Sequence, residues 1–288
     1  MFPGLIVAAL LTLPAPARSA EPAPEVPASM CPADPALGRL VAASDLVVIG
    51  RLPAPSQGRP TALRDYVDLP VEGIDTLKGA AAGSLAVRVF SGDRPYMPSN
   101  AALAETAGTP VLMFLTRVDE APAGYYFAGY TPSALRAASP AEVAGTAAEI
   151  ARQDTVIGQW RRDETLPHYT EVKALVDRLG SVRGAQQQAV FDRIEALGEE
   201  AVPAIVALMD DRRRLADQRM TLVNHATDAF EGMRHYGPEE VVDALAAILN
   251  QITGQSFGAI MNGGSEAERT GAVAGWRVYA ADLACPKP

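Results

Sequence analysis

Histidine and cysteine are scarce in this chain. Its 288 residues include three histidines, His168, His225 and His235, and two cysteines. The sequence has no His-Glu-x-x-His run and no closely spaced cysteine pair. On one continuous helix, His225 and His235 would lie about 15 Å apart along the axis, too far to share a metal ion. We therefore expect no metal site and no cofactor, and interpret the histidines as surface or capping residues.

The motifs of two common kinds of catalytic site are also missing. There is no Gly-x-Ser-x-Gly run that would present a nucleophilic serine. Residues 254–258, GQSFG, contain spaced glycines, but they lack a lysine and follow a helical pattern, whereas a phosphate-binding loop follows a strand. We interpret this segment, and residues 262–264 (NGG), as helix stops and tight turns. These absences favour a non-catalytic protein and leave an enzyme as the alternative.

An excess of basic residues and a membrane-spanning segment are absent as well. The formal net charge is −9, whereas proteins that bind nucleic acid normally carry a basic face, so we expect no nucleic-acid partner. No segment after the N-terminal leader is long and apolar enough to cross a bilayer, so we expect no membrane span. Hydrophobic residues make up 48% of the chain, which is enough for packed cores.

The N-terminus has the pattern of an export signal. Residues 4–13, GLIVAALLTL, form an apolar run too short to span a bilayer as a helix. Ala17 and Ser19 place small residues at −3 and −1 of a cut after Ser19, which is the pattern that a signal peptidase reads. We predict a signal peptide over residues 1–19, a Pro/Ala-rich extended leader over 20–38, and an exported protein, periplasmic or secreted.

The two cysteines lie near the two ends of the mature chain. In an oxidising compartment a pair is the natural state, and the termini of compact proteins often lie close together. A bridge between Cys31 and Cys285 would close a very long loop, worth up to about 5 kcal/mol in the chain-entropy model. Two interpretations stay open, this disulfide or two unpaired thiols in the tails. Neither cysteine has a neighbouring histidine or helix start that would lower its pKa, which argues against a catalytic thiol.

Residues 39–155 have the periodicity of a β domain. In the run 85–90, Leu85, Val87 and Val89 alternate strictly with Ala86, Arg88 and Phe90, so the two sets point to opposite faces of a strand. With the other apolar runs it predicts five short strands joined by polar loops, at about 46–52, 66–77, 85–90, 111–115 and 125–127. Such a set favours a small antiparallel β-barrel or sandwich. Ser139, followed by Pro140 and Glu142, then predicts the start of a helix.

Residues 156–288 have helical periodicity. Val172, Leu175, Val176 and Leu179 form one apolar face, and Gly180 follows as a stop signal. Further helices are predicted at about 190–197, 201–209, 215–233, 239–252 and 265–283. Six or so helices with short connections predict a helical stack. The chain as a whole is therefore predicted to be α+β, a small barrel followed by an α-helical domain.

Three segments of the β domain resemble a known module. They are residues 43–52 (ASDLVVIGRL), 77–79 (LKG) and 110–115 (PVLMFL). Together they resemble the netrin or tissue-inhibitor-of-metalloproteinases module of exported bacterial proteins, over about residues 31–155. The resemblance implies an OB-like barrel. Inhibitors of that family chelate a protease metal with a disulfide-held N-terminal cysteine ridge, whereas Cys31 has no partner inside the module.

The segment 197–211, LGEEAVPAIVALMDD, resembles the turn and second helix of a bacterial HEAT-like repeat. The flanking segments fit an array of helical pairs, but they do not repeat these letters. Terminal repeats of such arrays are often atypical in sequence. Residues 252–258 and Trp276 resemble the C-terminal segment of some exported HEAT-like proteins. The resemblance implies stacked helices that offer their surfaces to a partner.

Asp93, Arg94 and Tyr96 are the candidate binding residues. They lie in residues 91–108, which are predicted as one long loop, and such loops often carry binding sites or are plain surface loops. Three functions follow. The first is an exported, non-catalytic binding or scaffold protein that acts on an unidentified protein partner. The second is a metalloprotease-inhibitor-like protein, and the third is a hydrolase or ligand binder that uses the 91–108 loop. The missing catalytic motifs favour the first.

Overall fold

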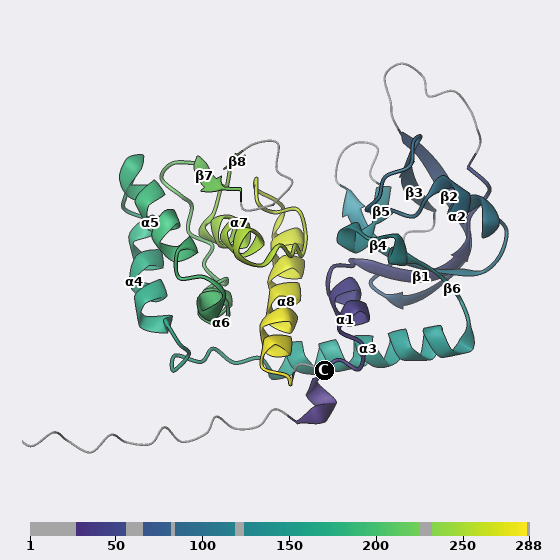
Figure 1. Ribbon diagram of the computed structural model, residues 1–288, viewed down its shortest axis with the longest axis horizontal. Helices are drawn as coiled ribbons and strands as arrows, with labels where there is room; N and C mark the ends of the chain where they lie inside the picture. The colour runs from purple at the N-terminus through teal and green to yellow at the C-terminus, as the bar shows by residue number, and fades with distance from the viewer. Residues whose placement is uncertain (1–26, 56–65, 82–83, 119–123, 225–231, 287–288) are drawn as a thin grey trace, which may run out of the picture.

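A computed structural model describes residues 27–55, 66–81, 84–118, 124–224 and 232–286 of the chain (Figure 1). The predicted signal peptide, residues 1–19, lies outside the described residues. A β-barrel and a helical part lie side by side, and the long helix α3 (Pro140–Gln159) runs beneath both (Figure 1). Each part has its own hydrophobic core. The chain is thus α+β, as predicted.

Five strands close the barrel. They are β1 (Leu46–Arg51), β2 (Tyr66–Lys78), β3 (Leu85–Phe90), β4 (Val111–Val118) and β5 (Gly124–Phe127). Their order is β1-β2-β3-β5-β4, and β1 pairs with β4 to complete the ring, which is the strand order of an OB-like barrel. The short strand β6 (Leu135–Ala137) adds to the outer side of β4. All neighbours are antiparallel except β3 and β5, which pair in parallel at Val87 and Tyr125. The predicted barrel and its five strands are therefore confirmed, with this one parallel pair as a correction.

The Leu-Lys-Gly segment at the end of β2 has a structural reason. Gly79 has φ +78°, and a Cβ atom there would collide with the carbonyl oxygen of Asp45. Lys78 donates from Nζ to the carbonyl oxygen of Val41, 2.7 Å away. Val41 belongs to helix α1 (Pro35–Ala42), which Asp34 caps and which begins inside the segment predicted as an extended leader. The end of β2 is thereby fastened to the end of α1.

The helical part contains five α-helices in the described residues. They are α4 (Tyr169–Leu179), α5 (Ala185–Glu195), α6 (Val202–Val206), α7 (Val241–Thr253) and α8 (Glu266–Leu283). Helix α7 is buried over its first nine residues and lies against α5, α6 and α8. Residues 197–211 form a turn, a short 3-10 segment (Glu199–Ala201) and α6, so the helix is shorter than the predicted 201–209. Ile205 and Met209 are fully buried, which assigns this segment to packing.

The helix predicted over 215–233 is wrong in its described residues, 215–224 and 232–233. Strands β7 (Met220–Val223) and β8 (Met233–Tyr236) pair antiparallel there. The reason lies on α5, where Gln187 donates to the carbonyl oxygen of Asp217 at 2.6 Å and accepts from its amide at 3.2 Å. Gln188 makes the same two bonds with Thr221, at 2.5 and 3.0 Å. The glutamine side chains therefore satisfy backbone groups that a helix would satisfy internally.

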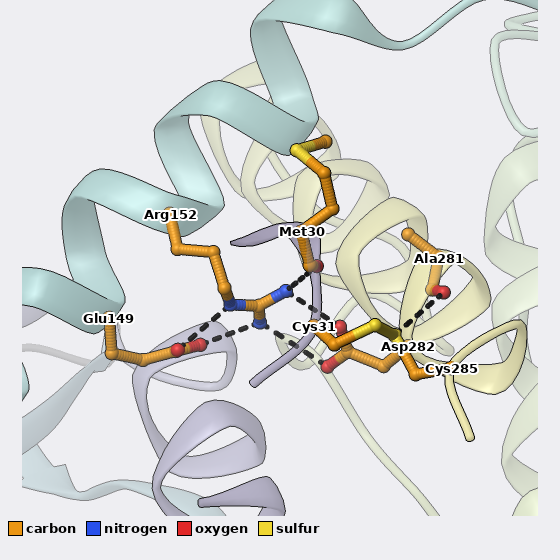
Figure 2. The surroundings of a disulfide bond; sticks show 7 residues. All are labelled: Met30, Cys31, Glu149, Arg152, Ala281, Asp282 and Cys285. Atoms are coloured by element: carbon orange, nitrogen blue, oxygen red, sulfur yellow. Dashed lines mark hydrogen bonds and ion pairs between the residues drawn. A yellow bond between two sulfur atoms is a disulfide. The ribbon is translucent and has the colours of Figure 1, made fainter. Parts of the chain in front are cut away.

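The segments at the two ends of the described residues meet below the barrel and the helical part (Figure 1). A disulfide joins Cys31 to Cys285 across 254 residues of sequence (Figure 2). Beside it, Arg152 of α3 contacts Glu149 at 2.7 Å and Asp282 of α8 at 2.9 Å, and donates to the carbonyl oxygen of Met30 at 2.7 Å (Figure 2). Burial lowers the pKa of Arg152, but these carboxylates outweigh it and hold the pKa above its ordinary value. This contact ties the N-terminal segment to α3 and α8.

Helix α3 is shared by the two parts. It runs past residue 155, where the boundary between the predicted domains falls, and Gln153 near that point donates to the carbonyl oxygen of Gly38 in α1 at 2.8 Å. Across the described ranges, no helix combines the length and the apolarity of a bilayer span.

Candidate binding cleft between the barrel and the helical part

A cavity of about 540 Å³ lies where the two parts face each other. The barrel side supplies α1 and the turn after β5, and the helical side supplies β8 and the segment that follows α7. Pockets of this size are typical of ligand sites. We call it the cleft, and its lining residues are Ala36, Arg39, Leu40, Ala43, Gly129, Tyr130, Thr131, Arg234, Asn250, Gly254, Gln255, Ser256, Phe257 and Met261.

The charged side chains that line the cleft are both arginines. Arg39 lies in the last turn of α1 and Arg234 lies on β8, and both are exposed. Arg234 donates to Asn250 at 3.4 Å, and in the described part of the chain neither arginine has a carboxylate at ion-pair distance. Among the described residues, no aspartate or glutamate lines the cleft, although the whole chain carries a net charge of −9. The described lining is therefore positively charged, and Arg39 also interacts electrostatically with Asp282 outside it.

An exposed aromatic side chain stands at the cleft. Tyr130 is 75% exposed, and its backbone has φ +48°, a left-handed conformation that costs a non-glycine residue about 1–2 kcal/mol. Its ring packs edge-on against Tyr96, which is 41% exposed, with 6.1 Å between the ring centroids. Strained backbone concentrates at functional sites, and exposed tyrosines are common anchors in interfaces.

The predicted binding residues have separate roles. Residues 91–108 are not one loop, because α2 (Asn100–Glu105) forms within them behind Ser99. Asp93 accepts from the backbone amide of Asn100 at 2.7 Å, so its carboxylate supports the start of α2. Arg94 lies over the ring of Phe90 at 5.4 Å. Asp93 and Arg94 share a separate depression of about 430 Å³, and only Tyr96 of the three reaches the cleft, through Tyr130.

The described histidines, His168 and His235, are not among the residues that line the cleft. His168 lies 3.7 Å from Glu200, and His235 is hydrogen-bonded to Thr221 at 3.0 Å. His225 falls outside the described residues. Within those residues, no group of three or more histidine, cysteine, aspartate or glutamate side chains is arranged to hold a metal ion. The cleft itself offers guanidinium, amide and hydroxyl groups, which can bind and orient a ligand.

A second cavity, of about 200 Å³, lies along the seam between the parts. Lys78 and Asp45 line it from the barrel, and small residues of α8, among them Gly271 and Gly275, line it from the helical part. A Cβ atom on Gly275 would lie 2.6 Å from Phe257, so glycine is needed for this close packing. Burial lowers the pKa of Lys78, and Asp45 and Asp154 oppose the shift. We assign this seam to packing. Lys78, through its bond to the carbonyl oxygen of Val41, holds helix α1, which also carries Arg39.

Sequence reasoning missed three residues of the cleft. Arg39 lies just beyond the predicted leader, and Arg234 lies one residue beyond the segment wrongly predicted as a helix. Tyr130 carried the clearest signal, because it is an aromatic residue in a Gly-Tyr-Thr-Pro turn directly after a strand. Such a turn exposes its side chains, and an exposed aromatic there points to contact with another molecule.

Comparisons with known protein families, with curated proteins and with solved structures found no match.

Proposed function

We propose that the protein is an exported, non-catalytic binding protein that acts through contact with a protein partner. The observation that carries the proposal is the cleft with Tyr130 at its edge. An aromatic side chain that is 75% exposed, on a backbone held in a costly conformation, is expected where a partner covers it. The apolar N-terminal run and the Cys31–Cys285 pair support export, since disulfides persist in oxidising compartments.

The chemistry of the lining favours binding over catalysis. Acid–base catalysis needs a group that exchanges protons near the working pH, such as a histidine, a carboxylate or a thiol. The described residues that line the cleft include none of these. Arginine keeps its charge at any working pH and serves as a fixed hydrogen-bond donor. We therefore assign the cleft to recognition.

The two family resemblances remain proposals. The strand order of the barrel supports kinship with the netrin-like module, since that module is OB-like. The buried turn and helix of residues 197–211 support a HEAT-like packing unit. The inhibitor alternative gains no support, because Cys31 is bonded to the end of the helical part rather than to the barrel. The hydrolase alternative gains none either, because the carboxylate of Asp93 is engaged with the backbone of α2.

Site-specific photo-crosslinking tests the proposal. A photoreactive phenylalanine analogue would replace Tyr130 in one variant and Arg178 of α4 in another, and each mature protein would be irradiated in envelope extract. Helix α4 lies on the side of the helical part away from the barrel, so position 178 serves as the control (Figure 1). We expect one discrete protein adduct from position 130 and none from position 178. No adduct, or the same adduct from both positions, would contradict a partner at the cleft.

A further inference from the structure

We infer that the cleft receives an acidic peptide segment of its partner, and that Arg39 and Arg234 bind the carboxylates of that segment. The inference rests on the proposed function and adds the chemistry of the partner. It begins from charge, since the cleft joins two exposed arginines from opposite parts of the molecule, and none of the described residues that line it is a carboxylate. Arginine offers a planar fork of donors that matches a carboxylate with two parallel hydrogen bonds.

The orientation of the helices distinguishes a peptide from a multiply charged anion. The cleft is lined by the C-terminal end of α1, at Ala43, and by Gly254 at the C-terminal end of α7. Phosphate groups prefer helix N-termini, where amides point outward, whereas C-terminal ends carry a partial negative charge. A peptide suits this mixture, since its carboxylates meet the arginines while its own N–H groups face the helix ends.

The neutral groups of the cleft also fit a peptide. Asn250, Gln255, Ser256 and Thr131 also line the cleft. Within the chain Asn250 donates to the carbonyl oxygen of Gln255, Ser256 donates to that of Gly258, and Thr131 accepts from the amide of Ser133. Amide and hydroxyl groups have more than one hydrogen-bonding position, so these side chains keep capacity for peptide groups. Tyr130 provides an apolar face at the edge. A volume of about 540 Å³ accommodates a few side chains and not a whole domain. The bound element is therefore a short segment.

Fluorescence anisotropy with model peptides tests the inference on the full mature chain. The probes are fluorescein-labelled tetraglutamate and tetraglutamine, at low ionic strength because charge pairing at a surface is screened by salt. The cleft variant is R39Q/R234Q. The control is R178Q/R183Q, which removes two exposed arginines of the helical part that lie outside the cleft lining. A third variant, R39K/R234K, keeps the charge and removes the planar fork.

We expect the wild type to bind tetraglutamate and not tetraglutamine. The R39Q/R234Q variant should weaken binding by at least about tenfold, because each lost arginine removes charge-assisted hydrogen bonds. The R39K/R234K variant should give an intermediate loss, and the control less than about a twofold change. Equal binding of the two peptides, or equal losses in R39Q/R234Q and R178Q/R183Q, would overturn the inference. Circular dichroism of each variant shows that it remains folded.

Competition experiments distinguish a peptide carboxylate from a free small anion as the ligand of the cleft. If free succinate or inorganic phosphate displaces the peptide at concentrations equal to its own, the cleft is a small-anion site and the peptide assignment is wrong. We expect neither to do so below about a hundredfold excess, since a single anion forms only part of the contacts. If the adduct at position 130 forms but tetraglutamate does not bind, the acidic peptide is excluded while the proposed function stands. If tetraglutamate binds and no adduct forms, the proposed function fails instead.

Discussion

The barrel and the helical part each bury an arginine, and they satisfy it in different ways. Arg88 of the barrel has a side chain 1% exposed and pairs at 2.9 Å with Asp68, whose side chain is 34% exposed. Its guanidinium also lies 4.1 Å from the centroid of the Tyr66 ring. Arg269 of the helical part pairs at 2.8 Å with Asp243, whose side chain is fully buried. The barrel thus covers its arginine with rings and a half-exposed acid, whereas the helical part encloses both charges.

This difference decides how far each part depends on its ion pair. Asp243 also accepts from the backbone amides of Glu239 at 3.1 Å and Glu240 at 2.9 Å, at the start of α7. Four donors therefore converge on one buried carboxylate, two of them from Arg269. The hydrogen bonds to Asp243 hold the pKa of Arg269 above its ordinary value, against the effect of burial. Glu240 and Glu239 lie further from the Arg269 guanidinium, at 3.3 and 3.4 Å, so loss of Asp243 would leave this buried charge only partly compensated, which is costly.

The largest expected effect is therefore that of D243N. We expect it to lower the free energy of unfolding by about 3 kcal/mol, because the neutral amide removes the nearest carboxylate from Arg269 and turns donors toward the α7 amides. Glu240 at 3.3 Å and Glu239 at 3.4 Å keep part of the Arg269 charge compensated. The matched change D68N in the barrel should cost only about 1 kcal/mol, because water reaches that carboxylate. Urea unfolding followed by tryptophan fluorescence measures both, since Trp276 is buried in the helical core and Trp160 packs against it.

Near-ultraviolet circular dichroism of the tyrosines serves as the second probe, since five of the eight tyrosines lie in the barrel part of the chain and three in the helical part. D243N should shift the tryptophan transition further than the tyrosine transition, and D68N should do the reverse. Equal free-energy losses for the two variants would show that exposure of the acid does not govern the cost, and the contrast between the parts would then be withdrawn.

The disulfide ranks second, and it tests whether the two parts unfold together. Its loop of 254 residues is long, so C31S/C285S should lower stability by about 2–4 kcal/mol, chiefly by freeing the unfolded chain. Because the bridge lies where the N-terminal segment, α3 and α8 meet, its loss should also separate the tyrosine and tryptophan transitions (Figure 2). Differential scanning calorimetry measures both changes.

Treating the wild type with reductant should reproduce the behaviour of the variant, and C31S/C285S itself should not respond to reductant. A single unfolding transition of C31S/C285S at the wild-type temperature would refute the role of the disulfide in coupling the two parts.

The barrel could be predicted from the sequence because its signals are local. Apolar runs and strict alternation, as in residues 85–90, specify strands whatever surrounds them. Even there, Arg88 occupies the polar side of the alternation and is nonetheless buried, because rings from neighbouring strands cover it. In the helical part, β7 depends on Gln187 and Gln188, which lie about thirty residues earlier in α5. Contacts at that separation leave no periodicity to detect, so the hairpin was predicted as a helix.

The cleft could not be predicted for a related reason. Arg39 and Arg234 are almost 200 residues apart in the chain and meet only because α1, α3 and α8 hold the two parts together. Neither belongs to a motif with a fixed spacing. The sequence of residues 91–108 predicts a loop in which Asp93 and Arg94 are free to bind, whereas in the structure helix α2 forms within this segment and engages Asp93. Tyr96 alone joined the observed site, by packing against Tyr130.

The smallest expected effect concerns pH and the contact between Lys78 and α1. Burial lowers the pKa of Lys78 below its ordinary value of 10.5. Between the lowered pKa and 10.5, the unfolded chain binds more protons than the folded chain, so this residue makes the free energy of unfolding rise with pH. Below the lowered pKa both states are protonated and the contribution is constant. The stability difference between wild type and K78M should therefore widen in favour of wild type as the pH rises from the lowered pKa toward 10.5.

Urea midpoints of the two proteins across that range measure the difference, and other alkaline transitions cancel because both proteins share them. The chain has only three lysines, so K173M on exposed α4 is a suitable control and should show no such widening. A difference that stays constant with pH would mean that water reaches the Lys78 ammonium. Lys78 donates to the carbonyl oxygen of Val41, which lies in the same turn of α1 as Arg39. If the Lys78 amine is buried and holds α1 in place, K78M should also bind tetraglutamate more weakly, because Arg39 would be less well positioned. If the ammonium is exposed, K78M should leave tetraglutamate binding unchanged.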